Sequence, residues 1–203
     1  YELITAEMPE EVIAIGERIE KRLAEKGITI RKINMKKFAE EINNFLPVYN
    51  ESWAENTGFV PMTADEVRQI GKDLKPIVDK DFIYFAEKDG KIIGVSLTVP
   101  NLNEIQINIK RGRLLPFGVF KILFGLKKIK SLRVLALGTL KEYRRMGIDV
   151  CFYVRNIKTA KEKGIIRSEA SWILEHNTMM NRALEHINGK VYRKYRIYEK
   201  SIA

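Results

Sequence analysis

The 203-residue sequence lacks several features that would place it in a common class of protein. It has a single cysteine, Cys151, so it forms no internal disulfide, and a reducing cytoplasm is expected. Its two histidines, His176 and His186, show no metal-ligand spacing, and no metal site is predicted. No apolar run approaches the roughly 18 residues of a membrane span, and no signal peptide is visible. These absences favour a soluble cytoplasmic protein without a transmembrane segment.

Acidic residues are missing between Ile105 and Leu140, although the whole chain carries 26 of them. Within the same stretch stand the basic residues Lys110, Arg111, Arg113, Lys121, Lys127, Lys128, Lys130 and Arg133. Such a block suits a phosphate-bearing ligand, nucleic acid or an anionic membrane, and a solvated basic face without a specific partner is the alternative. Aromatic residues do not alternate with these charges as base stacking requires, so no specific nucleic-acid partner is expected.

The most informative segment reads as a strand, a basic turn and a helix. Residues 134–137 form an apolar run suited to a buried strand, and helical spacing begins at Asp149. The turn between them contains Arg144, Arg145 and Gly147. Free backbone N–H groups at the start of a helix, together with arginine side chains, are suited to hold a phosphate group. The segment therefore predicts an anion site.

This turn resembles a known loop. Arg144-Arg145-Met146-Gly147-Ile148, preceded by Glu142-Tyr143, is similar to the acetyl-CoA pyrophosphate loop of the GCN5-related N-acetyltransferases, whose pattern is Gln/Arg-x-x-Gly-x-Gly/Ala. The resemblance implies that acetyl-CoA, or another acyl-CoA, is the co-substrate. It also implies which residues contact it: Arg144, Arg145, Met146, Gly147, Ile148 and Asp149 at the diphosphate, Leu137, Gly138 and Thr139 along the pantetheine arm, and Asn177 at the start of a later helix.

Two positions depart from the family pattern. Asp149 stands where the family has Gly or Ala, which puts a carboxylate at the mouth of the anion site. The alternative is that Asp149 only stabilises the first helical turn. The family's proton-donating tyrosine is also missing, because Leu184 and Glu185 occupy the corresponding place. No residue inherits that role from the resemblance.

The order of expected elements fits an α/β fold of the mixed α+β kind, with a GNAT-like central mixed sheet flanked by helices. Residues 1–27 are expected to form an N-terminal helical extension around a helix at 9–26, and residues 28–203 the acyltransferase domain. Strands are predicted at 28–33, at 82–87 and 91–99 around the Asp89-Gly90 turn, at 165–174 and at 191–199. Residues 119–130 are predicted to be an apolar helix packed against the sheet, with a membrane-surface helix, a dimer contact and a lid as alternatives.

Candidate residues for the acceptor side follow from the resemblance. The sequence predicts a helix capped by Asn34 that runs to Trp53, and a second helix that begins with a capping box at Thr63 and Glu66. The loop that joins these two helices faces the acceptor in relatives, which makes Trp53, Asn56 and Phe59 substrate-binding candidates. Arg113 is a candidate contact for an acidic acceptor group. Glu175 follows the strand that should flank the cleft, so it is the candidate base that removes a proton from the attacking amine.

The sequence thus predicts an enzyme, an N-acetyltransferase that transfers an acetyl or other acyl group from CoA to a small-molecule or peptide amine by direct attack. A homodimer is considered. One alternative is a GNAT-fold binding module without catalysis. Another is a basic domain that docks on nucleic acid or a membrane through residues 105–133.

Overall fold

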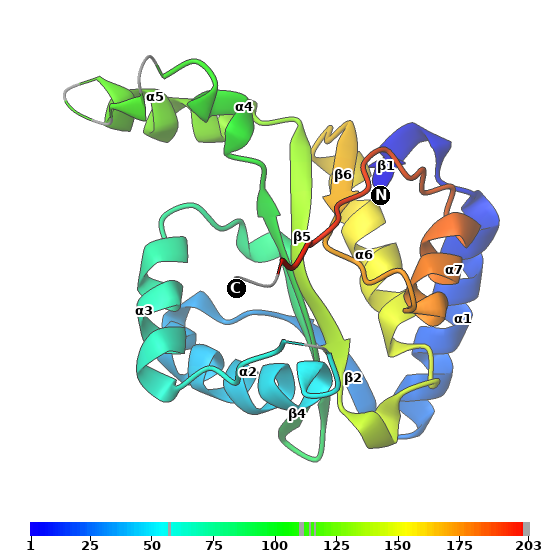
Figure 1. Cartoon of the computed structure of the whole chain (residues 1–203). Coiled ribbons are helices and arrows are strands. Elements are labelled where there is room, and N and C mark those ends of the chain that lie inside the picture. Colours follow the sequence, from blue (N-terminus) through cyan, green and yellow to red (C-terminus); the bar gives the residue numbers. More distant parts are fainter. Residues whose placement is uncertain (57, 110–111, 114, 116, 201–203) are drawn as a thin grey trace.

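The computed structural model describes residues 1–56, 58–109, 112–113, 115 and 117–200 (Figure 1). Within these residues the backbone forms a mixed sheet in the strand order β1-β6-β5-β4-β3-β2. Every neighbouring pair is antiparallel except β5 and β6, which run parallel. The strands are β1 (Glu2–Ile4), β2 (Ile28–Lys32), β3 (Ile83–Lys88), β4 (Lys91–Pro100), β5 (Ser131–Thr139) and β6 (Arg167–Ala170).

Helices cover both faces of the sheet (Figure 1). One face carries α1 (Glu10–Glu25), α6 (Ile148–Glu162) and α7 (Thr178–His186), and the other carries α2 (Phe38–Trp53) and α3 (Ala64–Leu74). Two shorter helices, α4 (Asn103–Gln106) and α5 (Gly118–Gly125), lie between β4 and β5 in the chain. Single 3-10 turns complete the order: η1 (Thr5–Glu7), η2 (Met35–Lys37), η3 (Lys80–Phe82), η5 (Leu126–Lys128) and η6 (Lys141–Tyr143). The expected mixed α+β fold is confirmed.

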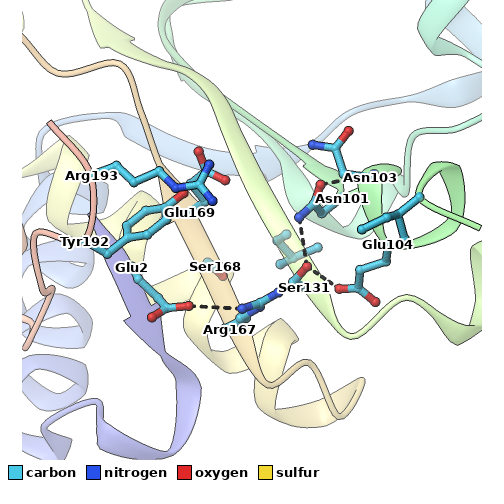
Figure 2. A pocket seen from close by; sticks show the side chains of 12 residues that line it. Glu2, Asn101, Asn103, Glu104, Ser131, Arg167, Ser168, Glu169, Tyr192 and Arg193 are labelled. Carbon is cyan, nitrogen blue, oxygen red and sulfur yellow. Dashed lines mark hydrogen bonds and ion pairs between the residues drawn. The ribbon is translucent and has the colours of Figure 1, made fainter. Parts of the chain in front are cut away.

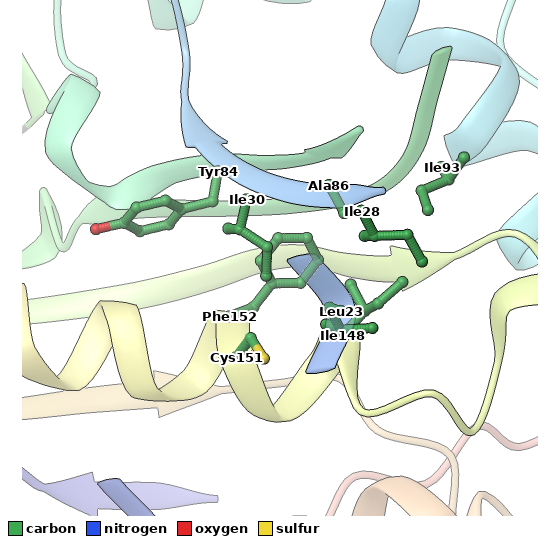
Figure 3. Packing of buried hydrophobic residues seen from close by; sticks show 9 residues of the cluster. All are labelled: Leu23, Ile28, Ile30, Tyr84, Ala86, Ile93, Ile148, Cys151 and Phe152. Atoms are coloured by element: carbon green, nitrogen blue, oxygen red, sulfur yellow. The ribbon is translucent and has the colours of Figure 1, made fainter. Parts of the chain in front are cut away.

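The core beneath α1 and α6 fixes the start of α6 against the sheet (Figure 3). Phe152 and Cys151 are fully buried, and Ile148 is almost so. They pack against residues of β2, β3 and β4 and against Leu23 of α1. A buried Phe, when cut to Ala, typically costs about 3–5 kcal/mol. The turn that precedes α6 is therefore anchored on its helical side.

Several local features agree with their sequence patterns. Asp89 and Gly90 both have positive φ, 49° and 75°, as the tight turn between β3 and β4 requires. The helix α3 begins with a capping box in which Thr63 and Glu66 bond to each other's backbone N–H groups. Pro47 lies inside α2, which nevertheless runs as one helix of 16 residues.

The predicted final strand at 191–199 is wrong. The structure shows no strand there, and only Lys190 makes an isolated bridge, to Glu2. The physical reason lies at the edge of the sheet, because the unpredicted strand β1 occupies the free side of β6. Residues 1–27 thus contribute an edge strand and the helix α1, whose Gly16 lies so close to Val154 of α6 that an added Cβ would come within 2.5 Å of it.

The predicted packing of residues 119–130 on the sheet is also wrong. In the structure the helix α5 covers only part of this range and is followed by η5. Its extensive contacts within the described residues are with α4 and η5, and Gly125 packs closely on Ile105. The α4–α5 segment projects from the body of the molecule as an arm (Figure 1).

Candidate functional site

The parallel strands β5 and β6 separate halfway along β5, and this separation creates a cleft. Their pairing runs from Ser131↔Arg167 to Val134↔Ala170 and then stops, whereas β5 continues to Thr139. At the same point β5 carries a bulge against β4, since Leu97 pairs with Ala136 and Thr98 with Val134. Leu135 is the extra residue. A cavity of about 170 Å³ fills the space beyond the separation.

The cavity brings together residues that are far apart in the sequence. The predicted residues Trp53, Asn56, Leu137 and Asn177 all line it. Trp53 and Asn56 come from the end of α2 and the loop after it, Leu137 comes from β5, and Asn177 caps α7 by accepting a hydrogen bond from the Met180 N–H. The resemblance implied acceptor contacts for Trp53 and Asn56 and pantetheine contacts for Leu137 and Asn177, and the structure has all four around one cavity.

Gly138 lies behind Trp53 and controls how closely α2 approaches β5. An added Cβ at Gly138 would lie 2.6 Å from the Trp53 ring and 2.9 Å from the Ser52 Cβ. The Trp53 ring is in turn stacked on Tyr49, with ring centroids 4.8 Å apart. Only a residue without a side chain fits between the strand and this aromatic stack.

The turn before α6 offers backbone N–H groups. Arg145 and Gly147 both have left-handed backbone angles, with φ of 66° and 85°. Within the described residues, the N–H groups from residue 145 to 150 have no hydrogen-bond acceptor, and the first helical bond that Gly147 accepts comes from Cys151. Orphan N–H groups at a helix start, reinforced by the helix dipole, bind anions. This is the arrangement that the sequence predicted.

One acidic residue competes for the cationic groups of this turn. The Glu55 carboxylate accepts hydrogen bonds from Lys141 Nζ at 2.8 Å and from Arg144 Nη1 at 2.9 Å. These two bonds lower the pKa of Glu55 to about 2. Arg144 is therefore paired with an internal anion, whereas the exposed Arg145 has no ion-pair partner among the described residues. Asp149 lies in the first turn of α6, as predicted.

Tyr153 is a cavity residue that was not among the candidates predicted from the sequence. It is 7% exposed, lines the cavity from α6 and donates a hydrogen bond to Met180 Sδ at 2.7 Å. Burial, followed by the charge of Asp149, raises the pKa of its hydroxyl, so the phenol stays protonated at neutral pH. The family's tyrosine position in α7 is occupied by Leu184, which is fully buried, and by the exposed Glu185.

The other predicted residues lie outside this lining. Glu175 is exposed and accepts a hydrogen bond from Arg196 Nη1 at 2.6 Å, which lowers the pKa of its carboxyl. Phe59 packs on Tyr49, with ring centroids 5.7 Å apart. Arg113 is exposed on the α4–α5 arm. Thr139 pairs with Gly94 at the end of β5, beyond the lining residues.

Cys151 is unsuited to act as a nucleophile. It is fully buried, with its Sγ 3.7 Å from the Gly16 carbonyl oxygen. Burial, with smaller contributions from Glu20 and Asp149, raises the pKa of the thiol to about 12. The reactive thiolate is therefore scarce at neutral pH. Within the described residues, no cluster of His, Cys, Asp or Glu could hold a metal ion.

A second cavity, of about 200 Å³, lies between the sheet and the helices α2 and α3. Its walls are almost entirely apolar and include Ile42, Tyr49, Val67 and Leu74. It shares Leu135 and Ala136, at the bulge, with the cavity in the cleft. An apolar space thus adjoins the cleft where the two strands separate.

Larger hollows are not at the cleft. Figure 2 shows a polar one of about 590 Å³ at the beginning of β5 and β6, where Arg167 faces Glu2 and Glu104 contacts Ser131. It lies at the opposite end of β5 from Thr139 and from the turn that offers its amides. The chemical groups at the cleft, and not the size of its cavity, therefore define the candidate site.

Comparison with solved structures identifies the class of fold. The chain has the fold of the GCN5-related N-acetyltransferases. An aminoglycoside N-acetyltransferase, AAC(6')-Iy, in complex with CoA, matches with a TM-score of 0.52 and 15% identity, over 86% of this chain and 95% of that one. A GCN5-related N-acetyltransferase from Sphaerobacter thermophilus matches with a TM-score of 0.50 and 15% identity, over 75% of this chain and 38% of that one. No protein-family model matches the chain.

Curated relatives are more similar in sequence. The chain is 35% identical over 204 residues to a protein named bacterial ceramide synthase from Caulobacter vibrioides, covering 98% of this chain and 52% of the relative. It is 38% identical over 183 residues to protein YghO from Escherichia coli, covering 87% of this chain and 47% of the relative. The chain therefore spans about half the length of the curated relatives it matches. None of the described helices is both long and apolar enough to cross a membrane.

Proposed function

We propose that this chain is an acyl-CoA-dependent N-acyltransferase domain that joins an acyl group to the nitrogen of a long-chain amine. The observation that carries the proposal is the separation of β5 from β6 after Val134, directly upstream of a turn whose amides lack acceptors. A cleft beside the strand and an anion site at its end suit a thioester whose carrier bears a diphosphate.

The residues present fit such a carrier. The N–H groups of residues 145–150 and the Arg145 side chain would hold the diphosphate, and Arg144 would join them on leaving Glu55. The end of β5, from Leu137 to Thr139, would hold the pantetheine arm, with Asn177 on the other side of the cleft. The acyl carbon would then lie near the bulge at Leu135, where the two cavities share residues.

The acceptor class follows from the apolar cavity between α2, α3 and the sheet. The proposed carrier site begins at α6 on the other face of the sheet, and we assign the cavity against α2 and α3 to the alkyl chain of the acceptor. The name of the Caulobacter relative points the same way, because a ceramide is an N-acylated long-chain amino alcohol. Burying its alkyl chain would favour such an acceptor by about 0.8 kcal/mol per CH₂ group.

The reaction needs two proton movements. The neutral amine attacks the thioester carbon, the new C–N bond forms, and the C–S bond breaks after the tetrahedral intermediate collapses. The departing thiolate takes a proton from the Tyr153 hydroxyl, the nitrogen loses a proton to water, and the Tyr153 phenolate regains a proton from solvent. We assign this donor role to Tyr153 because its phenol lines the cavity from α6 and its hydroxyl proton already points to another sulfur atom there, Met180 Sδ.

The test measures thiol release from acetyl-CoA and palmitoyl-CoA with a series of amino alcohols from two to eighteen carbons. We expect kcat/KM to rise with the chain length of the amine. Leu74→Trp, which fills the α3 wall of the apolar cavity, should remove this rise, whereas Lys72→Trp on the exposed side of α3 should keep it. A release rate independent of amine length would refute the acceptor class.

A second assay separates transfer from binding alone. Both tryptophans of the chain, Trp53 and Trp172, line the cleft cavity, so their fluorescence should change when CoA enters. A fluorescence change without thiol release for any amine would identify a non-catalytic binding module, which the departures at Asp149 and in α7 would explain. Neither a change nor release at millimolar CoA would overturn the proposal.

A further inference from the structure

The arm formed by α4 and α5 ends in an apolar helix face that nothing in the described chain covers. Val119 and Leu123 are four residues apart in α5, and so are Phe120 and Phe124. The four side chains therefore share one face of the helix. Phe120 is 57% exposed, Leu123 54% and Phe124 75%. Phe117, just before the helix, is 73% exposed. Soluble monomers seldom leave so many large apolar side chains together in water.

The opposite side of α5 is closely packed against the rest of the arm, and this packing determines which side of the helix is exposed. Gly118 is buried, and an added Cβ there would lie 2.5 Å from the Arg113 carbonyl oxygen. Gly125 fits equally closely against Ile105 of α4. The glycines thus seat one side of α5 on the arm, and the apolar side chains of its other side are left exposed.

Positive charge accompanies the apolar face. Lys121 lies within α5, and Lys127 and Lys128 follow in η5; all three are exposed. The sequence has no acidic residue between Ile105 and Leu140 to offset them. Apolar and aromatic side chains flanked by lysines are the composition of helices that lie in the interface of an anionic bilayer.

We infer that the α5 face, defined as Phe117, Val119, Phe120, Leu123 and Phe124 with Lys121, Lys127 and Lys128, docks the protein on an anionic lipid bilayer. The eight residues of α5 make a helix about 12 Å long, which suits insertion parallel to the surface and is far too short to span. This inference rests on the arm alone and does not depend on the proposed acyl transfer.

A second copy of the chain is a poorer occupant of this face. In a two-fold symmetric contact the same patch meets itself, so the lysines of both copies would be brought together without an acidic residue to offset them. Lipid phosphates instead offer the opposite charge around an apolar interior.

The test is co-sedimentation of the full chain with vesicles of phosphatidylcholine alone or with 30% phosphatidylglycerol, at low and high salt. We expect the protein to bind the vesicles that contain phosphatidylglycerol, and to bind vesicles of phosphatidylcholine alone at least tenfold more weakly. Phe120→Ser/Phe124→Ser should reduce it at least tenfold, whereas the control Ile197→Ser, at a residue 98% exposed outside the arm, should not. No binding at low salt, or binding unchanged by the double substitution, would overturn the inference.

A charge variant protects the test against misfolding of the apolar one. Lys127→Glu/Lys128→Glu changes only exposed side chains and should weaken binding to anionic vesicles by about fivefold or more for each lysine, with no change in melting temperature. Lys26→Glu/Lys72→Glu changes two exposed lysines outside the arm and should have a smaller effect. Vesicle-independent dimers in analytical ultracentrifugation that Phe120→Ser/Phe124→Ser dissociates would assign the face to a second copy and refute the lipid.

Discussion

Gly138→Ala tests the packing on which the cleft depends. The new Cβ would lie 2.6 and 2.8 Å from two atoms of the Trp53 six-membered ring and 2.9 Å from the Ser52 Cβ. Real Cβ atoms do not approach so closely, so the ring must move. It has little room, because it stacks on Tyr49 and Tyr49 stacks on Phe45. Overpacking of this kind typically costs about 1–3 kcal/mol.

The expected loss of stability can be measured by thermal unfolding. For a domain of this size a loss of 1 kcal/mol lowers the melting temperature by about 2–4 °C, so Gly138→Ala should lower it by about 2–12 °C. Gly138 is not among the residues with positive φ, so the loss would not arise from backbone strain. Gly94→Ala, on the adjacent strand, is the matched control, since its nearest contacts would be 3.3 Å away and its loss should be smaller.

A double substitution isolates the clash. Phe lacks the part of the tryptophan ring that the new Cβ would meet, so Trp53→Phe should recover about 1–2 kcal/mol of the loss when combined with Gly138→Ala. The double-mutant cycle, measured by calorimetry, gives this coupling directly. A melting temperature of Gly138→Ala equal to that of the wild type, or zero coupling with Trp53→Phe, would show that Gly138 does not set the distance between α2 and β5.

Five further predictions concern the site. Tyr153→Phe should lower kcat about 100-fold or more while fluorescence-detected CoA binding stays unchanged; equal kcat would remove its donor role. Glu55→Gln should tighten CoA binding severalfold by releasing Arg144, and calorimetric titration would detect this. Because the Glu55 pKa is depressed to about 2, this ion pair should persist above pH 4.5 and be lost only as pH falls towards 2, so CoA affinity between pH 6 and 8 should not report its titration. Asp149→Gly should also tighten CoA binding, and unchanged affinity would mean that its carboxylate points away. Glu175→Gln tests the sequence-based prediction of a base; its pairing with Arg196 leads us to expect little change in kcat.

Sequence patterns sufficed where the determining interactions are local. The turn at Asp89-Gly90, the capping box at Thr63 and the strand-turn-helix around Gly147 each depend on residues within a few positions of one another. The fold class followed from their order. The turn with free amides before α6 was therefore predictable, because all of it lies in one continuous stretch, and its binding of an anion stays a prediction.

Patterns failed where two distant segments compete for the same place. Residues 191–199 are rich in β-branched and aromatic residues, which suit a strand, but the edge of β6 is already paired with β1. Which of the two segments gains that edge depends on how α1 packs on α6, and no local feature of either segment carries that information. The helix α5 is a similar case. Its apolar composition predicts that it is buried, but does not tell whether it packs on the sheet or on something outside the chain.

Tyr153 shows why the remaining part of the site was out of reach. On α6 it occupies the same apolar stripe as Val150, Val154 and Ile157, and the spacing of that stripe makes it indistinguishable from a core residue. What sets it apart is that β6 has ended where its side chain emerges, so that its hydroxyl meets a cavity and Met180 instead of a strand. With Tyr153 as the proposed donor, the proton would come from α6, whereas the resemblance implies a donor in the helix after β6, where this chain has Leu184 and Glu185.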